Sequence, residues 1–331
     1  MNTNSTKANS TLPADSRTEF STDPSYAAET NGGRDGAAIF AGANEHDHAV
    51  SGPSNFETAL ELEARQFAAR SHASDGQGQR PVRVIVADLE FGYDRTRNGG
   101  YRTAEGKDAE NDIRWPFHRV ACACWFVLRF DPGYDVPVVE TITVAANDEA
   151  SEQEITVRLF AALELCPDAL LATWAGEGKD LPVLRRVASE YGLLLPPQLL
   201  DLSPYARQRL DLCRAVAGRA AFPHLPEYAA AVGVPCKPSP SKQIGQLVEC
   251  EVWDKVRDQC LADVLTTTVI GLRHLAAHGA IAIHPQRSLL VLADAAAKAM
   301  PASKFVSTRF SPWARGQVAG ARLKGTVFRA A

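Results

Sequence analysis

Two carboxylates at the end of one apolar segment are the residues of this sequence best placed to do chemistry. Asp88 and Glu90 stand one residue apart at the end of residues 81–91, PVRVIVADLEF. The β-branched residues there favour a strand, and alternation along a strand puts i and i+2 on the same face. Both acids therefore point into one site, where a divalent cation would compensate their charge. The D-x-E pattern is common, however, and by itself a solvated strand end explains it better.

Asp180 is a third acid at a position where two explanations compete. It follows an expected strand at 169–174 and a turn that contains Gly176 and Gly178, and it stands at the start of an expected helix. An N-cap aspartate followed by Pro182 accounts for it structurally. It also fits a metal-site acid delivered from a strand–helix junction, and the residue alone favours the cap.

Asp263 lies within the apolar face of a long expected helix at 253–278. Helix propensity and burial both disfavour an aspartate there unless a partner compensates it. An exposed polar position is the alternative. The order of the four acids along the chain is more informative than any one of them.

The expected elements describe a mixed α/β sheet. Strands are expected at 81–91, 118–130, 138–144, 169–174 and 199–202; helices are expected at 152–165, 181–191, 204–217, 225–232, 242–247 and 253–278. A polar loop or hairpin tip is expected at 92–111. Three neighbouring strands followed by alternating helix and strand are typical of an α/β fold with flanking helices.

Composition divides the chain of 331 residues into three parts. Residues 1–79 are rich in Ser, Thr, Asn and Gly and are expected to be disordered, apart from a short helix at 55–72. Residues 80–280 form the folded domain. Residues 281–331 are a basic C-terminal tail, which is either a polyanion-binding segment or a solvated, mobile end. The net charge of −4 does not by itself indicate a nucleic-acid-binding protein.

Seven cysteines at irregular spacing indicate free thiols in a reducing compartment. Cys122 and Cys124 are expected to be small buried residues of a strand rather than metal ligands. The sequence shows no signal peptide and no run of about 18 apolar residues, so we expect a cytoplasmic protein without a membrane partner.

Residues 81–274 resemble the DEDD-type, DnaQ-like 3′–5′ exonucleases. Within them the chain is most similar to the predicted exonucleases related to the proofreading domain of family B DNA polymerases. Residues 88–90 (DLE) correspond to the first motif and 173–184 (TWAGEGKDLPVL) to the second, usually T-F-N-G-x-G-F-D-L-P-x-L. The third region is matched by three segments, 208–212 (QRLDL), 225–237 (LPEYAAAVGVPCK) and 259–267 (QCLADVLTT). In place of the last segment the family usually has Y-C-x-x-D-V-L-x-T.

This resemblance implies a ribonuclease H-like fold and a two-metal 3′–5′ exonuclease that releases nucleoside 5′-monophosphates from the 3′ end of a single strand. DNA is the expected substrate ahead of RNA, in a setting such as DNA repair. Asp88, Glu90, Asp180 and Asp263 would hold two Mg²⁺ or Mn²⁺ ions, whose preference is for oxygen ligands. The residues implied to contact substrate are Leu89, Phe91, Trp174, Gly176 and Lys179.

The chain departs from the family pattern at three positions. Gln259 replaces a tyrosine one helical turn before Asp263; it would orient the attacking water but cannot accept a proton at neutral pH. Ala175 replaces an asparagine, and Lys179 replaces a phenylalanine. With these changes we expect a slow exonuclease. The alternative is a catalytically weak or inactive module that binds nucleic acid or a protein.

Overall fold

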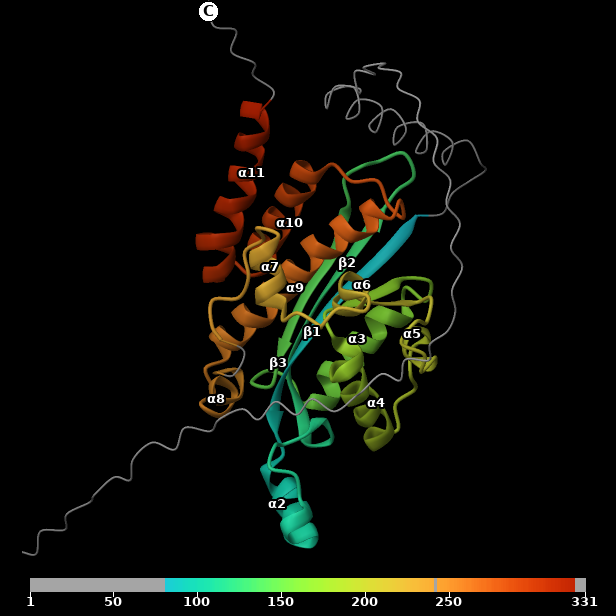
Figure 1. Cartoon of the computed structure of the whole chain (residues 1–331), viewed down its shortest axis with the longest axis vertical. Helices are drawn as coiled ribbons and strands as arrows, with labels where there is room; N and C mark the ends of the chain where they lie inside the picture. The colour runs from blue at the N-terminus through green and yellow to red at the C-terminus, as the bar shows by residue number, and fades with distance from the viewer. Residues whose placement is uncertain (1–80, 241–242, 325–331) are drawn as a thin grey trace, which may run out of the picture. The chain divides into compact units, whose positions relative to one another are not determined.

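The computed structural model describes residues 81–240 and 243–324, without the side chains of the last three (Figure 1). The predicted disorder of residues 1–79 and the helix at 55–72 lie outside this range. The described residues build a sheet in the order β3-β2-β1-β4-β5. Its strands are β1 (Val82–Tyr93), β2 (His118–Phe130), β3 (Val138–Ala146), β4 (Leu170–Thr173) and β5 (Arg209–Asp211).

The strand directions define a ribonuclease H-like sheet. β2 is antiparallel to both β1 and β3, whereas β4 runs parallel to β1 and β5 parallel to β4. Antiparallel neighbours need only short connections, and parallel neighbours need a crossover, which the helices between β3, β4 and β5 provide. The predicted fold class, a mixed α/β sheet flanked by helices, is confirmed.

Helices cover both faces of this sheet. The described helices are α2 (Arg95–Glu105), α3 (Glu152–Glu164), α4 (Asp180–Tyr191), α5 (Pro197–Leu200), α6 (Leu212–Ala217), α7 (Leu225–Ala231), α8 (Ile244–Glu249), α9 (Trp253–Ala277), α10 (Pro285–Ala299) and α11 (Ser311–Lys324). α2 projects beyond the end of the sheet (Figure 1). α9 and α10 pack on one face, and α3 and α4 pack on the other (Figure 1).

Alternation along β1 sends its side chains into two separate apolar clusters. Val84 and Val86 join the cluster that contains α9, while Ile85 and Ala87 join the cluster that contains α3 and α4. The period of two continues past the apolar run. The side chains that follow Val86 on the α9 face are therefore acidic ones.

Three expectations about secondary structure were wrong. Residues 92–111 contain α2. Its N-cap residue is Asp94, whose carboxylate accepts the N–H of Arg97 at 2.9 Å. Residues 199–202 are not a strand, because Leu199 and Leu200 form the end of α5, a short helix that begins at Pro197. Residues 204–217 are helical only from Leu212; Arg209–Asp211 before it forms β5, the last strand.

Part of the predicted basic tail, residues 281–331, is packed structure. α10 contacts β3 and α9, and a π-helical turn η5 (Val306–Phe310) joins the same region to α11. Leu292 and Phe310 are fully buried in the α9-side cluster. Asp258 of α9 also accepts the backbone N–H of Phe305 at 3.1 Å, which fixes the turn against the domain.

α9 is long and apolar enough to cross a membrane by length and composition alone, contrary to the expectation that no segment would be. Most of it is buried between the sheet and its neighbouring helices. A central helix that is covered on all sides is apolar all round for the same reason as a membrane helix. Its burial within the domain accounts for its composition.

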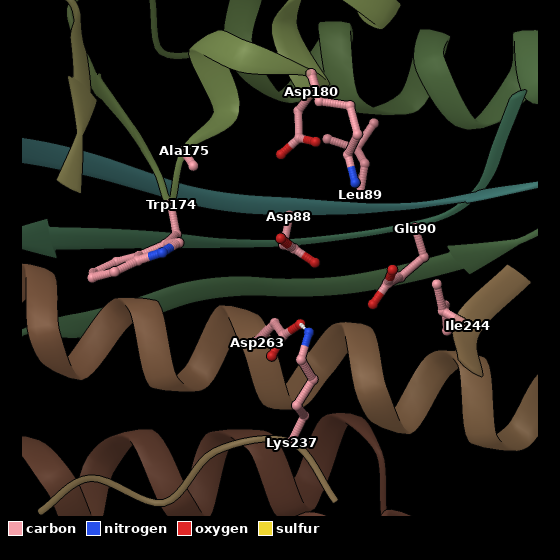
Figure 2. Close-up of a pocket in the computed structure, with 10 residues that line it drawn as sticks. Asp88, Leu89, Glu90, Trp174, Ala175, Asp180, Lys237, Ile244 and Asp263 are labelled. Atoms are coloured by element: carbon pink, nitrogen blue, oxygen red, sulfur yellow. Dashed lines mark hydrogen bonds and ion pairs between the residues drawn. The ribbon is translucent and has the colours of Figure 1, made fainter. Parts of the chain in front are cut away.

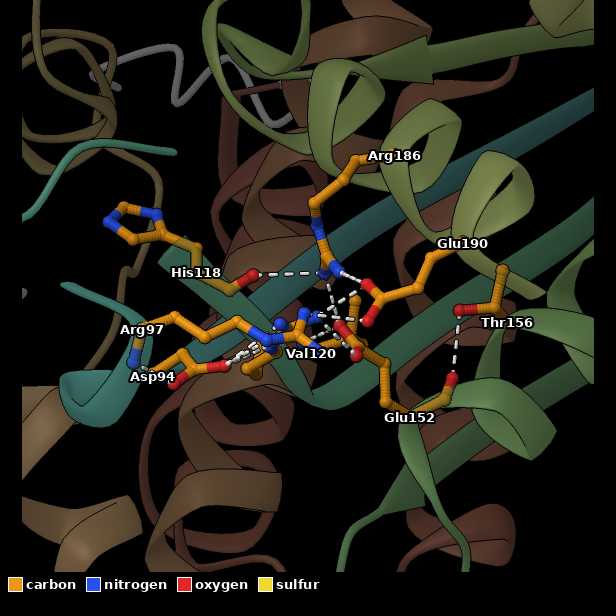
Figure 3. Close-up of polar contacts among 9 residues, drawn as sticks. Asp94, Arg97, His118, Val120, Glu152, Thr156, Arg186 and Glu190 are labelled. Carbon is orange, nitrogen blue, oxygen red and sulfur yellow. Dashed lines mark hydrogen bonds and ion pairs between the residues drawn. The ribbon is translucent and has the colours of Figure 1, made fainter. Parts of the chain in front are cut away.

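An ionic cluster joins β2 to α2, α3 and α4 at the end of β1 (Figure 3). Its charged members are Asp94, Arg97, Arg119, Glu152, Arg186 and Glu190. Glu190 accepts hydrogen bonds from Arg97 and Arg119, each at 2.7 Å. Burial alone would raise the pKa of Glu190, but the hydrogen bonds from these two arginines outweigh it and lower the pKa to about 2. The charged form of Glu190 therefore stabilises the fold.

We expect Glu190→Gln to lower the free energy of unfolding at pH 7 by about 1–3 kcal/mol. The pKa of an unfolded glutamate is about 4.3. Because the folded pKa is lower, the contribution is complete above about pH 4.5 and disappears as the pH falls toward 2. Urea unfolding across this range measures it.

Glu164→Gln is the matched control, since Glu164 is an exposed glutamate of α3 without an ion pair among the described residues. Its stability should follow that of the wild type at every pH. A Glu190→Gln deficit that is absent at pH 7, or unchanged at pH 2, would contradict this role.

Candidate active site

Three of the predicted metal ligands meet where β1 passes α9. Asp88 and Glu90 lie on the α9 face of β1, and Asp263 projects toward them from the middle of α9 (Figure 2). One carboxylate oxygen from each lies within 4.8 Å of the others. The alternation of β1 and the long apolar face of α9 thus bring together acids that are far apart in the chain.

Asp180, the fourth predicted ligand, reaches the same cavity from the other side. It is the first residue of α4, is buried, and points toward the space between the other acids (Figure 2). All four carboxylates line one cavity of about 190 Å³. Asp180 stands outside the tight group of three, so its carboxylate borders the cavity rather than sharing their close contact.

Burial and mutual repulsion make these carboxylates unusually basic. Burial, followed by the charges of Asp263, Glu90 and Asp180, raises the pKa of Asp88 well above its ordinary value. Burial also raises the pKa of Glu90 to about 8 and that of Asp180 to about 6. Glu90 therefore holds a proton at neutral pH in the absence of a cation, and a cation that binds there must displace it.

Two lysines supply positive charge at this cavity. The Nζ atom of Lys237 donates to Oδ2 of Asp263 at 2.5 Å. Burial alone would lower the pKa of Lys237, but the charge and hydrogen bond of Asp263 outweigh it and raise the pKa. Lys179 lies over the ring of Phe91, 4.6 Å from its centroid, and also lines the cavity. The one ammonium in contact with a carboxylate, that of Lys237, cannot by itself neutralise the four carboxylates that line the cavity.

The atoms left without partners test whether the site fits a metal. Oε1 of Glu90 and Oδ1 of Asp263 are buried and accept no hydrogen bond from any described residue. Such atoms are costly to bury without a partner. Clustered carboxylate oxygens are the ligands that Mg²⁺ and Mn²⁺ prefer. The donor set therefore fits hard divalent cations.

The turn that carries Asp180 is shaped by a close backbone approach. A Cβ added to Gly176 would lie 2.5 Å from Oγ1 of Thr173, so only glycine fits there. Ala175, one residue before, adopts the left-handed conformation at φ 56°. Asparagine tolerates that region better than alanine does, which gives a physical reason for the asparagine in the family pattern.

The predicted substrate-contact residues divide into two groups. Leu89, Trp174 and Lys179 line the acidic cavity. Phe91 lies beneath Lys179, and Gly176 is buried in the turn, so both shape the site from behind.

Gln259 is buried on α9, one turn before Asp263. It lines neither the acidic cavity nor a second cavity that adjoins it. Neither amide atom of its side chain has a hydrogen-bond partner among the described residues. Instead, the neighbouring Cys260 directs its Sγ atom at the backbone oxygen of Asp88, 3.4 Å away.

The comparison with protein families identifies the chain. The model of a family described as predicted 3′–5′ exonucleases related to the exonuclease domain of PolB matches residues 111–300, more than half of the sequence. The chain belongs to this family. The resemblance seen in the sequence is confirmed. The matched residues include Asp180 and Asp263 but begin after β1, which carries the other two acids.

Solved structures similar to this exonuclease-family chain are large nucleic-acid enzymes. The family B DNA polymerase of the archaeon Pyrobaculum calidifontis shares 15% identity, with a TM-score of 0.41 over 68% of this chain and 30% of that one. Escherichia coli exonuclease I in complex with a dT13 oligonucleotide shares 14% identity, with a TM-score of 0.34 over 59% and 41%. The chain thus spans less than half the length of either. No curated protein matches it.

Sequence reasoning missed three residues that build the site of this family member. Lys237 was quoted within a matching segment but given no role, because its partner Asp263 is 26 residues away. Ile244 lines the cavity without a chemical signal. Asp211, at the end of β5, accepts the N–H groups of Ala175 and Glu177 and so holds the turn before Asp180.

Asp88 and Asp211 should respond in opposite directions to replacement by asparagine. Without metal at pH 7, Asp88→Asn should stabilise the protein by about 0.5–2 kcal/mol, because the carboxyl of Asp88 ionises more readily in the unfolded chain than among the acids of the fold, and an amide does not ionise in either state. Asp211→Asn should destabilise it by about 1–3 kcal/mol because an amide N–H then faces backbone donors. Denaturant unfolding in EDTA measures both.

The pH dependence gives a second check on Asp88. The pKa of Asp88 is higher in the folded than in the unfolded protein. The gain in free energy of unfolding from Asp88→Asn should therefore vanish below about pH 4, where the carboxyl is protonated in both the folded and the unfolded state, and it should grow as the pH rises. Equal destabilisation by both substitutions would show that the carboxylate of Asp88 is satisfied within the protein.

Proposed function

We propose that this protein is a metal-dependent 3′–5′ exonuclease that removes nucleoside 5′-monophosphates from the 3′ end of single-stranded DNA. The observation that carries the proposal is the convergence of Asp88, Glu90, Asp180 and Asp263 on one cavity. Membership of an exonuclease family supports the reaction class. The relation of that family to the exonuclease domain of PolB favours DNA over RNA.

The four carboxylates would hold two Mg²⁺ or Mn²⁺ ions. When bound, two such ions supply an activated water and stabilise the charge on the attacking and leaving oxygens of a phosphodiester. Glu90 and Asp263 offer unpartnered oxygens for them, and Lys237 holds the other oxygen of Asp263 in place. Buried carboxylates on a rigid strand and helix need little rearrangement to receive the cations.

The remaining side chains of the cavity would position the strand. Leu89 and Trp174 present apolar surface next to the acids, where the terminal sugar and base would lie. Lys179 supplies a cation at the cavity, within reach of a phosphate that enters it. Gln259, expected from the sequence to orient the attacking water, is buried and lines neither cavity, so it is poorly placed for that role. As an amide it cannot take the proton, so a modest turnover rate is expected.

Gln259 also supports a second candidate function. A polar residue that lines neither cavity is poorly placed for chemistry, and a nuclease-like module that only binds nucleic acid or a protein would tolerate it. Such a module has no need, however, for four acids buried at a cost in stability. The same digestion experiment distinguishes the two functions.

Digestion of end-labelled single-stranded DNA tests the exonuclease directly. With Mg²⁺ or Mn²⁺, a 5′-labelled strand should shorten progressively, and a 3′-labelled strand should release its label as a mononucleotide in the first step. Asp88→Ala should lower the rate by at least about 10³-fold, since loss of a metal ligand removes both water activation and charge stabilisation.

Asp294→Ala is the matched control, because Asp294 is an exposed aspartate of α10 away from the site. It should digest the strand as the wild type does. If the wild type binds the strand but leaves it intact, or if Asp88→Ala digests it equally well, the protein is not the exonuclease proposed here.

A further inference from the structure

A second cavity opens directly from the acidic one. It has a volume of about 310 Å³ and shares its inner wall with the acidic cavity through Asp88, Trp174, Ala175, Lys237 and Asp263. Its outer wall comes from one segment beyond β5, with the side chains of Cys213, Phe222, Pro223, His224, Leu225 and Pro226. Of the four acids predicted as metal ligands, Asp88 and Asp263 line it, on the shared wall, and Glu90 and Asp180 do not.

Phe222 is the feature of this outer wall that needs explanation. Its side chain is 55% exposed at the rim of a charged cavity. A large apolar side chain left open to water beside a concave site is informative, whereas one scattered on a flat surface is not. The guanidinium of Arg214 lies over one side of the ring, 5.3 Å from its centroid. A ring held from one side by a cation offers its free surface to another flat group.

The rim that carries Phe222 is held in a fixed conformation. The carbonyl oxygen of Pro223 accepts a hydrogen bond from the thiol of Cys213 at 3.5 Å. The next residue, His224, caps α7, where its N–H donates to the carboxylate of Glu227 at 3.3 Å. Arg214 in turn pairs with Asp211, the residue that holds the turn of the acidic site. A rigid rim loses little entropy when it receives a ligand.

We propose that Phe222, backed by Arg214, is the stacking platform for one unpaired nucleobase of the strand whose scissile phosphate lies at Asp88 and Asp263. This inference rests on the proposed exonuclease function and specifies how its substrate is held. Every base has a π-face, so an aromatic platform accepts any of them, and the cation of Arg214 strengthens the stack. Phe222 lies outside the motifs that relate the chain to its family.

The size of the second cavity is compatible with a single base. Ligand pockets for small molecules measure about 300–1,000 Å³, so this one lies at the lower limit. The ring of Phe222 at its rim can stack only on a base whose flat face is free, as in a single-stranded or frayed 3′ end.

Binding of a fluorescein-labelled single strand, with phosphorothioate linkages at its 3′ end to prevent cleavage, tests the platform by anisotropy. Phe222→Ala should weaken binding about 5- to 150-fold, the range expected for one lost base stack. Phe222→Tyr keeps the ring and should bind as the wild type does. Tyr205→Ala is the control, since Tyr205 is an 83% exposed aromatic residue that lines neither cavity. Thermal unfolding of each variant verifies that it is folded.

Abasic substitution locates the base. When single positions near the 3′ end lose their base in turn, one position should weaken binding to the wild type as much as Phe222→Ala does. The same abasic strand should bind Phe222→Ala no more weakly than the intact strand does. Fully additive losses, or binding by Phe222→Ala equal to that by Tyr205→Ala, would overturn the platform.

Digestion of the unprotected strand separates this inference from the proposed function. If the wild type digests the strand and Phe222→Ala has the same KM and the same affinity, the stacking role of Phe222 is wrong and the exonuclease function stands. A wild type that binds through Phe222 but never cleaves keeps the platform and removes the exonuclease. If the wild type does not bind a single strand, both are wrong.

Discussion

Four carboxylates around one cavity, three of them buried and Asp88 half-buried, are the constraint on which the rest of the structure depends. Burial raises the pKa of each of them, and the charges of Asp263 and Asp180 raise the pKa values of Asp88 and Glu90 further. A fold keeps such a group only when its surroundings compensate it. Here the rest of the domain is stable enough to hold the acids in place, and a pair of divalent cations would supply the compensation that Lys237 alone does not.

The domain holds these acids by placing them on its most rigid parts. β1 is paired on both sides within the sheet, and α9 is buried along most of its length. The turn before Asp180 is fixed by Gly176 against Thr173 and by the carboxylate of Asp211. Asp211 also pairs with Arg214, which backs Phe222, so one aspartate supports both the acidic cavity and the rim beside it.

Local signals in the sequence predicted the longer strands and singled out the acids of β1 and α9, whereas the role of all four acids as metal ligands was implied by the family resemblance and stays a prediction. The β-branched run of β1 and its period of two indicated that Asp88 and Glu90 share a face, and an aspartate amid the apolar residues of α9 indicated a buried partner. The predictions failed where stability comes from distant residues. α2, with two adjacent glycines, has weak intrinsic propensity and is held by the ion pairs of Arg95 with Glu249 and of Arg97 with Glu190. β5 is only three residues long, too short for a periodic pattern.

Calorimetric titration with Mn²⁺ at pH 7 is the most direct test of the central claim, that these four acids hold a pair of cations. Two ions should bind per chain, and binding should release protons, because the pKa of Glu90 is about 8 before the metal enters. The release is visible as a heat of binding that changes with the ionisation enthalpy of the buffer. Asp88→Asn should lose at least one of the two ions. Absence of Mn²⁺ binding to the wild type, or equal binding to Asp88→Asn, would contradict the account.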